Sequence, residues 1–146
     1  MRGIYTAGVL DVFLEEGISA DLVMGVSAGA IHGCSFVSGQ HGRSIRYYLK
    51  YCADKRFMSV HSLLTTGDMV GEQFCYHDIP DRLDPFDHDA FEASPMEFRV
   101  VCSNLATGKA EYIRCPSLRG EKIDYLRASA SMPFVSHIVR IDGKEL

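Results

Sequence analysis

The chain has 146 residues, 47% of them hydrophobic, and a net charge of −4 at neutral pH. This length predicts a single domain over residues 1–146 with a proper hydrophobic core. No basic block indicates nucleic acid, no apolar run is long enough to span a bilayer, and the N-terminus lacks the order of a secretory signal.

The N-terminal third predicts a helix, a strand and two further helices. Tyr5–Glu16 places its apolar residues on one face and ends before Gly17, a residue type common after helix ends. Leu22–Val26 is a short apolar run, as in a buried strand. Ala28–Val37 and Arg43–Lys55 follow as helices, and the second of them is clearly amphipathic.

Residues 57–96 form the least regular part of the chain. Short helices are expected near Asp78–Leu83 and Asp87–Ala93, with prolines at 80 and 85 between other elements. Acidic residues outnumber basic ones in this segment. We interpret it as a solvated covering region, and a lid or an acyl-binding cover is the functional alternative.

The C-terminal third predicts a hairpin, a helix and the start of a second hairpin. Glu97–Asn104 alternates apolar and polar residues and pairs with Ala110–Cys115 across a short turn. Lys122–Ala130 is a helix, and Val139–Ile141 begins another strand. Asp142-Gly143 is a typical two-residue hairpin turn.

Helices and strands therefore alternate along the chain, which predicts an α/β fold with a parallel or mixed sheet covered by helices on both faces. A buried parallel strand at Leu22–Val26 needs a neighbour on each side, and only a helix precedes it. We therefore expect the chain to begin after a first strand that it does not contain.

The cysteines favour a reducing compartment. Their number is odd, their spacing is wide, and no C-x-x-C pair occurs. We expect reduced thiols that act as small core residues in a cytoplasmic protein, and we expect no metal site and no organic cofactor. The five residues are Cys34, Cys52, Cys75, Cys102 and Cys115.

A candidate nucleophile lies in the pentapeptide Gly25-Val26-Ser27-Ala28-Gly29, which matches G-x-S-x-G. A serine on a tight strand-to-helix turn adopts a strained backbone, and the residues two before and two after it must be small to avoid a collision. The turn also leaves Ser27 at the positive end of a helix, where the N–H of Ala28 can stabilise an oxyanion. The alternative is a serine that merely caps the helix.

A second helix N-terminus supports the same interpretation. Arg2-Gly3 directly precedes the first expected helix, so its N–H groups would also point at an anion. We therefore include Arg2 and Gly3 in the candidate oxyanion hole, although Arg2 could equally be an ordinary surface charge. A triad with His137 as base and Asp142 as its partner is a further alternative that the spacing does not support.

Three motifs make the chain resemble the patatin-like phospholipases. MRGIYTAGVLD is similar to the end of that family's glycine-rich stretch and the helix after it, and GVSAGAI is similar to its nucleophile elbow. ASASMPFVS, residues 128–136, resembles the segment that leads toward the family's second catalytic residue. The resemblance implies a patatin-like, lysophospholipase-type fold and hydrolysis of acyl esters of lipids through a Ser–Asp dyad and an acyl-enzyme. The substrate would be a lipid or another acyl ester, met in transient contact with a membrane surface.

The chain departs from the family pattern at two places. The triple glycine is absent before Arg2-Gly3, and no D-G-[GA] motif follows Ser27. Asp142-Gly143-Lys144 comes nearest to that motif, but it is better interpreted as a hairpin turn. We therefore expect the general base to be an aspartate beyond Leu146, and the 146 residues to be an inactive piece trimmed at both ends. An acyl transferase and a catalytically inactive lipid-binding module remain alternative functions.

Overall fold

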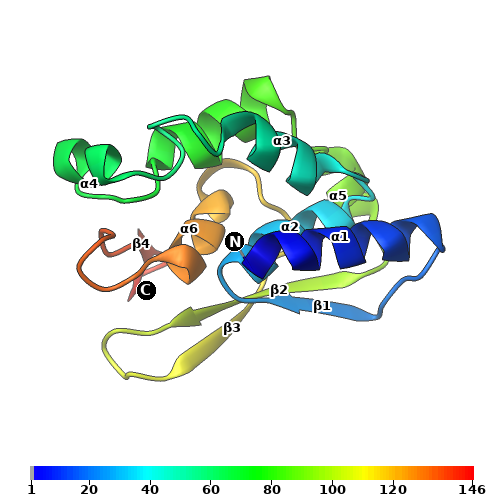
Figure 1. The fold of residues 1–146 in the computed structure, drawn as a ribbon. Helices are drawn as coiled ribbons and strands as arrows, with labels where there is room; N and C mark the ends of the chain where they lie inside the picture. The colour runs from blue at the N-terminus through cyan, green and yellow to red at the C-terminus, as the bar shows by residue number, and fades with distance from the viewer. Residues whose placement is uncertain (1) are drawn as a thin grey trace.

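A small mixed sheet organises the fold. The computed structural model describes residues 2–146. Strand β1 (Leu22–Gly25) runs parallel to β2 (Glu97–Ser103), which pairs antiparallel with β3 (Ala110–Arg114), as Figure 1 shows. The register places Val23 opposite Phe98. The expected mixed α/β class and the expected hairpin between the second and third strands are confirmed.

The helices of the described residues gather on one face of this sheet (Figure 1). On the covered face Phe98, Val100 and Cys102 are buried, whereas Leu22 and Met24 of β1 are 41% and 46% exposed. The expectation of helices on both faces is therefore corrected for residues 2–146. The apolar run Leu22–Val26 predicts a buried strand, but the residues of β1 alternate between a covered and an open face. The main helices are α1 (Arg2–Glu15), α2 (Ala28–Val37), α3 (Arg43–Tyr51), α5 (His88–Ala93) and α6 (Asp124–Ala130).

Two helix ends show which local interactions decide the boundaries. Helix α1 ends where expected, because Gly17 takes a φ of 65° and its N–H and that of the next residue return to carbonyls of the last turn. Helix α3 ends at Tyr51 rather than Lys55. The carboxylate of Asp54 accepts a hydrogen bond of 2.9 Å from the backbone N–H of Arg56, which favours a turn over a further helical residue.

The segment between α3 and α5 is more helical than its sequence predicts. Helix α4 (Val60–Thr66) was not expected; it is capped by Ser59, whose hydroxyl accepts from the N–H of Ser62 at 2.9 Å. The expected short helix near Asp78–Leu83 is the second half of η1 (Phe74–Leu83), a π-helix that contains a proline. The expected helix at Asp87–Ala93 is confirmed as α5, with Asp87 as its N-cap.

The C-terminal elements follow the prediction closely. A short 3₁₀ turn, η2 (Gly120–Ile123), leads into α6, and the strands β4 (Arg140–Ile141) and β5 (Lys144–Glu145) form a hairpin. Asp142 and Gly143 have φ values of 49° and 74°, as a two-residue turn of this kind requires. The prediction that Asp142-Gly143 is a hairpin turn is confirmed.

Two groups of buried side chains hold these elements together. The larger one lies between the sheet, α2 and α6 and includes Val100 and Leu126, and the smaller one joins α3 to η1. Cys34, Cys102 and Cys115 are buried, as expected of core thiols, whereas Cys52 is exposed. In the part of the chain that the structure describes, no helix is long and apolar enough to cross a membrane.

Candidate active site

Ser27 has the backbone of a tight strand-to-helix turn. Its φ and ψ are 53° and −124°, between the end of β1 and the start of α2. A non-glycine residue in such a conformation costs about 1–3 kcal/mol and persists only where its surroundings hold it. The Ser27 hydroxyl makes no capping hydrogen bond to the helix. The interpretation of Ser27 as an ordinary helix cap is therefore wrong, and its hydroxyl is not engaged in holding the fold.

The two glycines of the pentapeptide differ in their reason for being small. A Cβ on Gly25 would lie 2.4 Å from the backbone N and Cα of Ala30, so no larger residue fits there. A Cβ on Gly29 would meet nothing within 4 Å. The steric prediction is confirmed for Gly25 and is wrong for Gly29, because Gly29 lies inside the first turn of α2, where its Cα faces open space.

Ser129, near the end of α6, holds the turn at Ser27 from outside. Its hydroxyl accepts a hydrogen bond of 2.8 Å from the N–H of Ser27 and donates one of 2.6 Å to the carbonyl of Val101 in β2. The relay connects the strained serine to the central strand through a residue 102 positions away. The sequence around Ser129 favours a structural role, since this serine does not lie in a glycine-flanked turn, and it carries no local signal of a contact with Ser27.

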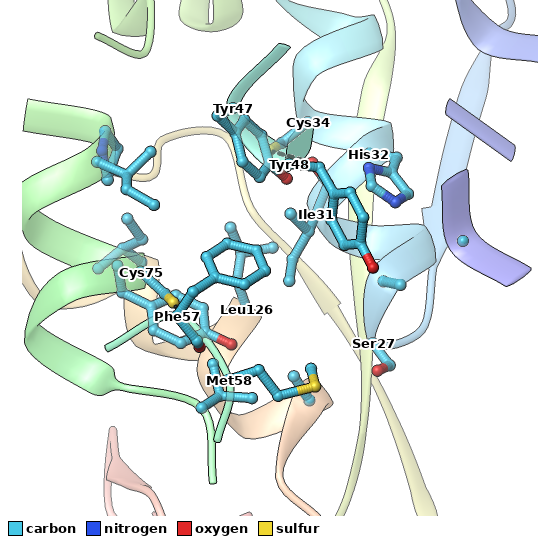
Figure 2. Close-up of a pocket in the computed structure, with 18 of the residues that line it drawn as sticks. Ser27, Ile31, His32, Cys34, Tyr47, Tyr48, Phe57, Met58, Cys75 and Leu126 are labelled. Carbon is cyan, nitrogen blue, oxygen red and sulfur yellow. Dashed lines mark hydrogen bonds between the residues drawn. The ribbon is translucent and has the colours of Figure 1, made fainter. Parts of the chain in front are cut away.

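Ser27 opens onto an apolar pocket. The cavity has a volume of about 480 Å³, and Ser27 lines one side of it (Figure 2). Its walls come from α2, α3, η1 and α6, together with the chain between α3 and α4, and include Ile31, Tyr48, Phe57, Met58, Cys75 and Leu126. The segment 57–96 thus supplies part of the pocket wall, so our interpretation of it as a merely solvated cover is wrong for these residues.

The candidate oxyanion donors lie where two helices begin. Among residues 2–146 the N–H of Ala28 donates no hydrogen bond, so it remains available at the N-terminus of α2. Gly3 lies in the first turn of α1, and a Cβ there would come within 2.9 Å of the Ala28 Cβ and 3.0 Å of His32 Nε2. Both N-termini therefore face the same region with their positive dipole ends. The Arg2 side chain lies outside the described atoms.

His32 is a residue of the pocket that sequence reasoning did not single out. It is buried, it lines the cavity, and its Nδ1 has no hydrogen-bond partner among the described residues. Burial lowers the pKa of His32, and the negative charge of Asp11 opposes this only in part. The imidazole is therefore neutral at neutral pH and packs beside Gly3. Its position one turn after Ala28 on a small-residue helix was the available signal.

The pocket thiols do not offer a rival nucleophile. Burial raises the pKa of Cys34 to about 11 and that of Cys75 to about 12. Both are therefore protonated at neutral pH, and a thiol is a far weaker nucleophile than a thiolate. In the described part of the chain, no cluster of three or more histidine, cysteine, aspartate or glutamate side chains could hold a metal ion.

The candidate bases are placed away from Ser27. No carboxylate lines the pocket within residues 2–146. Asp142 accepts hydrogen bonds from Lys122 Nζ at 2.7 Å and Tyr125 Oη at 2.5 Å, and these bonds lower its pKa. The alternative that pairs His137 with Asp142 is wrong: His137 Nδ1 lies 2.9 Å from a carboxylate oxygen of Asp68, and neither residue lines the pocket.

Comparison with known proteins identifies the family. The family model described as patatin-like phospholipase matches residues 1–146, and the chain belongs to this family. The family indicates lipid-ester hydrolysis as the general activity. A curated relative, the uncharacterized protein YjjU of Escherichia coli (strain K12), is 33% identical over 70 residues, which are 47% of this chain and 20% of that protein. The matched segment therefore spans about a fifth of the relative's length.

Proposed function

We propose that this patatin-like chain carries the nucleophile of a serine hydrolase that cleaves carboxylic esters of lipids. The observation that supports this most is the setting of Ser27, whose unbonded hydroxyl sits on a strained turn at the edge of a largely apolar pocket. A cavity of about 480 Å³ suits one acyl chain, with the ester carbonyl at Ser27.

The reaction that we propose is acyl transfer in two stages. A base takes the proton of the Ser27 hydroxyl while its oxygen attacks the ester carbonyl, and the tetrahedral intermediate expels the alcohol, which receives the proton. Water then attacks the acyl-serine and gives up a proton to the base. The second tetrahedral intermediate releases the fatty acid and expels the Ser27 oxygen, which takes the proton back from the base. The N–H of Ala28 and the first turn of α1 at Arg2-Gly3 are the proposed donors to the oxyanion.

The general base in this proposal is an aspartate that follows Leu146. The absence of a carboxylate from the pocket lining of residues 2–146 supports this, as does the engagement of Asp142 with Lys122 and Tyr125. A Ser–Asp dyad, a single catalytic domain that includes these residues and a cytoplasmic location remain predictions. No metal or organic cofactor takes part in the proposed steps.

A fluorophosphonate probe tests the proposal on the protein in the full length encoded by its gene. We expect covalent labelling of Ser27, hydrolysis of a long-chain acyl ester, and loss of both in Ser27→Ala. A folded protein that is not labelled at Ser27 would favour the inactive binding module. Products analysed with a competing alcohol separate the remaining alternative, because a transferase would yield the new ester in place of free fatty acid.

A further inference from the structure

We propose that α4 and the chain after α6 form an apolar rim that docks on a lipid surface beside the mouth of the pocket. This inference rests on the proposed function, since a lipid surface would supply the substrate. We define the apolar rim by five side chains that are 43% to 101% exposed: Met58, Val60, Leu64, Met132 and Phe134.

Helix α4 buries a serine and exposes two apolar side chains. Ser62 is only 4% exposed, whereas Val60 and Leu64 are 64% and 81% exposed. Val60 and Leu64 are four residues apart, so they lie on the same face of the helix. A surface helix normally buries such apolar residues. Val60 and Leu64 instead form an apolar strip on the exposed side of α4, next to the polar side chains of the same helix, and this strip can meet a lipid surface.

Phe134 presents a second apolar group on the same side of the molecule. Its side chain is fully exposed, and its backbone φ is 70°. A bulky residue in the left-handed region is unusual and is held there against strain. The ring packs against no described residue, so the backbone hydrogen bonds on either side of Phe134 hold this conformation and leave the ring free to meet another surface.

The two segments form one surface because three hydrogen bonds connect them. The carboxylate of Asp68 accepts from the backbone N–H of His137 at 2.6 Å and lies 2.9 Å from its Nδ1. The N–H of Met69 donates to the carbonyl of Val135 at 2.8 Å. Figure 1 shows α4 and the segment after α6 on the same side of the molecule. Residues 69 and 135 therefore hold Phe134 next to the end of α4.

The surface continues into the pocket, which decides between possible occupants. Met58 and Met132 belong to the apolar rim and also line the cavity that contains Ser27. A protein partner or a second copy on this surface would close the route by which an ester reaches Ser27, whereas a lipid surface would both cover the rim and supply the ester. Charge agrees with this, since Asp68 is the one carboxylate in residues 57–70 and 131–138 and it is engaged by His137.

The absence of tryptophan from the sequence allows a direct test. Phe134→Trp in a Ser27→Ala background places a single indole on the rim, and Tyr112→Trp in the same background places one on the open sheet face, where Tyr112 is 58% exposed. With vesicles of phosphatidylcholine and phosphatidylglycerol, we expect the emission at position 134 to shift to shorter wavelength and that at position 112 to stay unchanged. Leu64→Ser should weaken partitioning to these vesicles about tenfold.

Three results would refute the docking of the apolar rim on lipid. They are no shift at position 134, equal shifts at positions 134 and 112, and partitioning of Leu64→Ser that is not weakened. A shift at position 134 that follows protein concentration without lipid would assign the rim to a second copy. The proposed function is tested separately in the unsubstituted protein. Loss of vesicle binding with Ser27 still labelled by a fluorophosphonate overturns the rim alone, and vesicle binding without labelling overturns the proposed function alone.

Discussion

Substitution of Ser129 by alanine tests whether the turn at Ser27 needs support from α6. The change removes the acceptor of the Ser27 N–H at 2.8 Å and the donor to the Val101 carbonyl at 2.6 Å. A partly buried N–H left without a partner costs about 1–3 kcal/mol, so we expect the free energy of unfolding to fall by about 2 kcal/mol.

The effect on reactivity should exceed what this loss of stability explains. The conformation of Ser27 stores about 1–3 kcal/mol of strain, and release of part of it would move the hydroxyl and the N–H of Ala28 away from the attacking geometry. If the barrier rises by about 1.4–2.7 kcal/mol, the rate of labelling of Ser27 by a fluorophosphonate falls about ten- to a hundredfold.

Ser131→Ala is the matched control for this experiment. Ser131 ends the same helix, and its hydroxyl donates to the carbonyl of Arg127 at 3.1 Å without touching the turn at Ser27. We expect its labelling rate to stay within about twofold of the unsubstituted protein, a barrier change well under 1 kcal/mol. Urea unfolding and labelling are measured on both variants under conditions where each is folded. Equal labelling rates for Ser129→Ala and Ser131→Ala would refute the reasoning.

Three further predictions follow from close contacts and burial. Gly25→Ala should prevent a stable fold because its Cβ would lie 2.4 Å from the Ala30 backbone, whereas Gly29→Ala, with open space around it, should unfold within about 1 kcal/mol of the unsubstituted protein; thermal unfolding compares them. Gly3→Ala should push α1 away from Ala28 and lower the rate at which a fluorophosphonate labels Ser27 by more than the change in the free energy of unfolding accounts for. An unchanged labelling rate would remove Gly3 from the oxyanion region. Burial lowers the pKa of His32 from 6.5, so the unfolded chain binds more protons than the folded one and the free energy of unfolding decreases as pH falls below 6.5. Urea unfolding above and below that pH should show a smaller decrease in His32→Leu than in the unsubstituted protein. An equal decrease in the two proteins would contradict this prediction.

Local patterns predicted those parts of the fold that local interactions decide. The helix over residues 28–37, the hairpin of β2 and β3 and the turn at Asp142-Gly143 all follow from residue periodicity and from turn-forming residues next to one another in the sequence. Helix α4 was missed because Val60 and Leu64 face outward and because its N-cap Ser59 is not followed by the Glu or Gln of a capping box. A search for apolar residues on one buried face could not reveal a helix that buries Ser62 and exposes Val60 and Leu64.

In the candidate site, too, the sequence predicts the local features and misses the contacts between distant residues. The G-x-S-x-G spacing predicts the turn at Ser27, because the requirement for a small residue at Gly25 acts within five residues. The contacts of Ser129 and Gly3 with this turn join residues that only the folded chain brings together, and no periodicity encodes them. Similarly, His137 pairs with Asp68 rather than Asp142 because the chain between α6 and β4 lies against the chain that follows α4.

Contacts from three directions hold the strained backbone at Ser27. The backbone of Ala30 presses on Gly25 from α2, the hydroxyl of Ser129 holds the Ser27 N–H from α6, and Gly3 packs on Ala28 from α1. Each contact is provided by a separate element, so relaxation of the turn would require several elements to move together. Because the same elements α2 and α6 also line the pocket, a substitution in the pocket wall that shifts either helix should alter the geometry of Ser27 as well as the space for the acyl chain. Under the proposed function, the binding of an acyl chain in the pocket and the reactivity of Ser27 are therefore coupled through packing, even where no residue touches both.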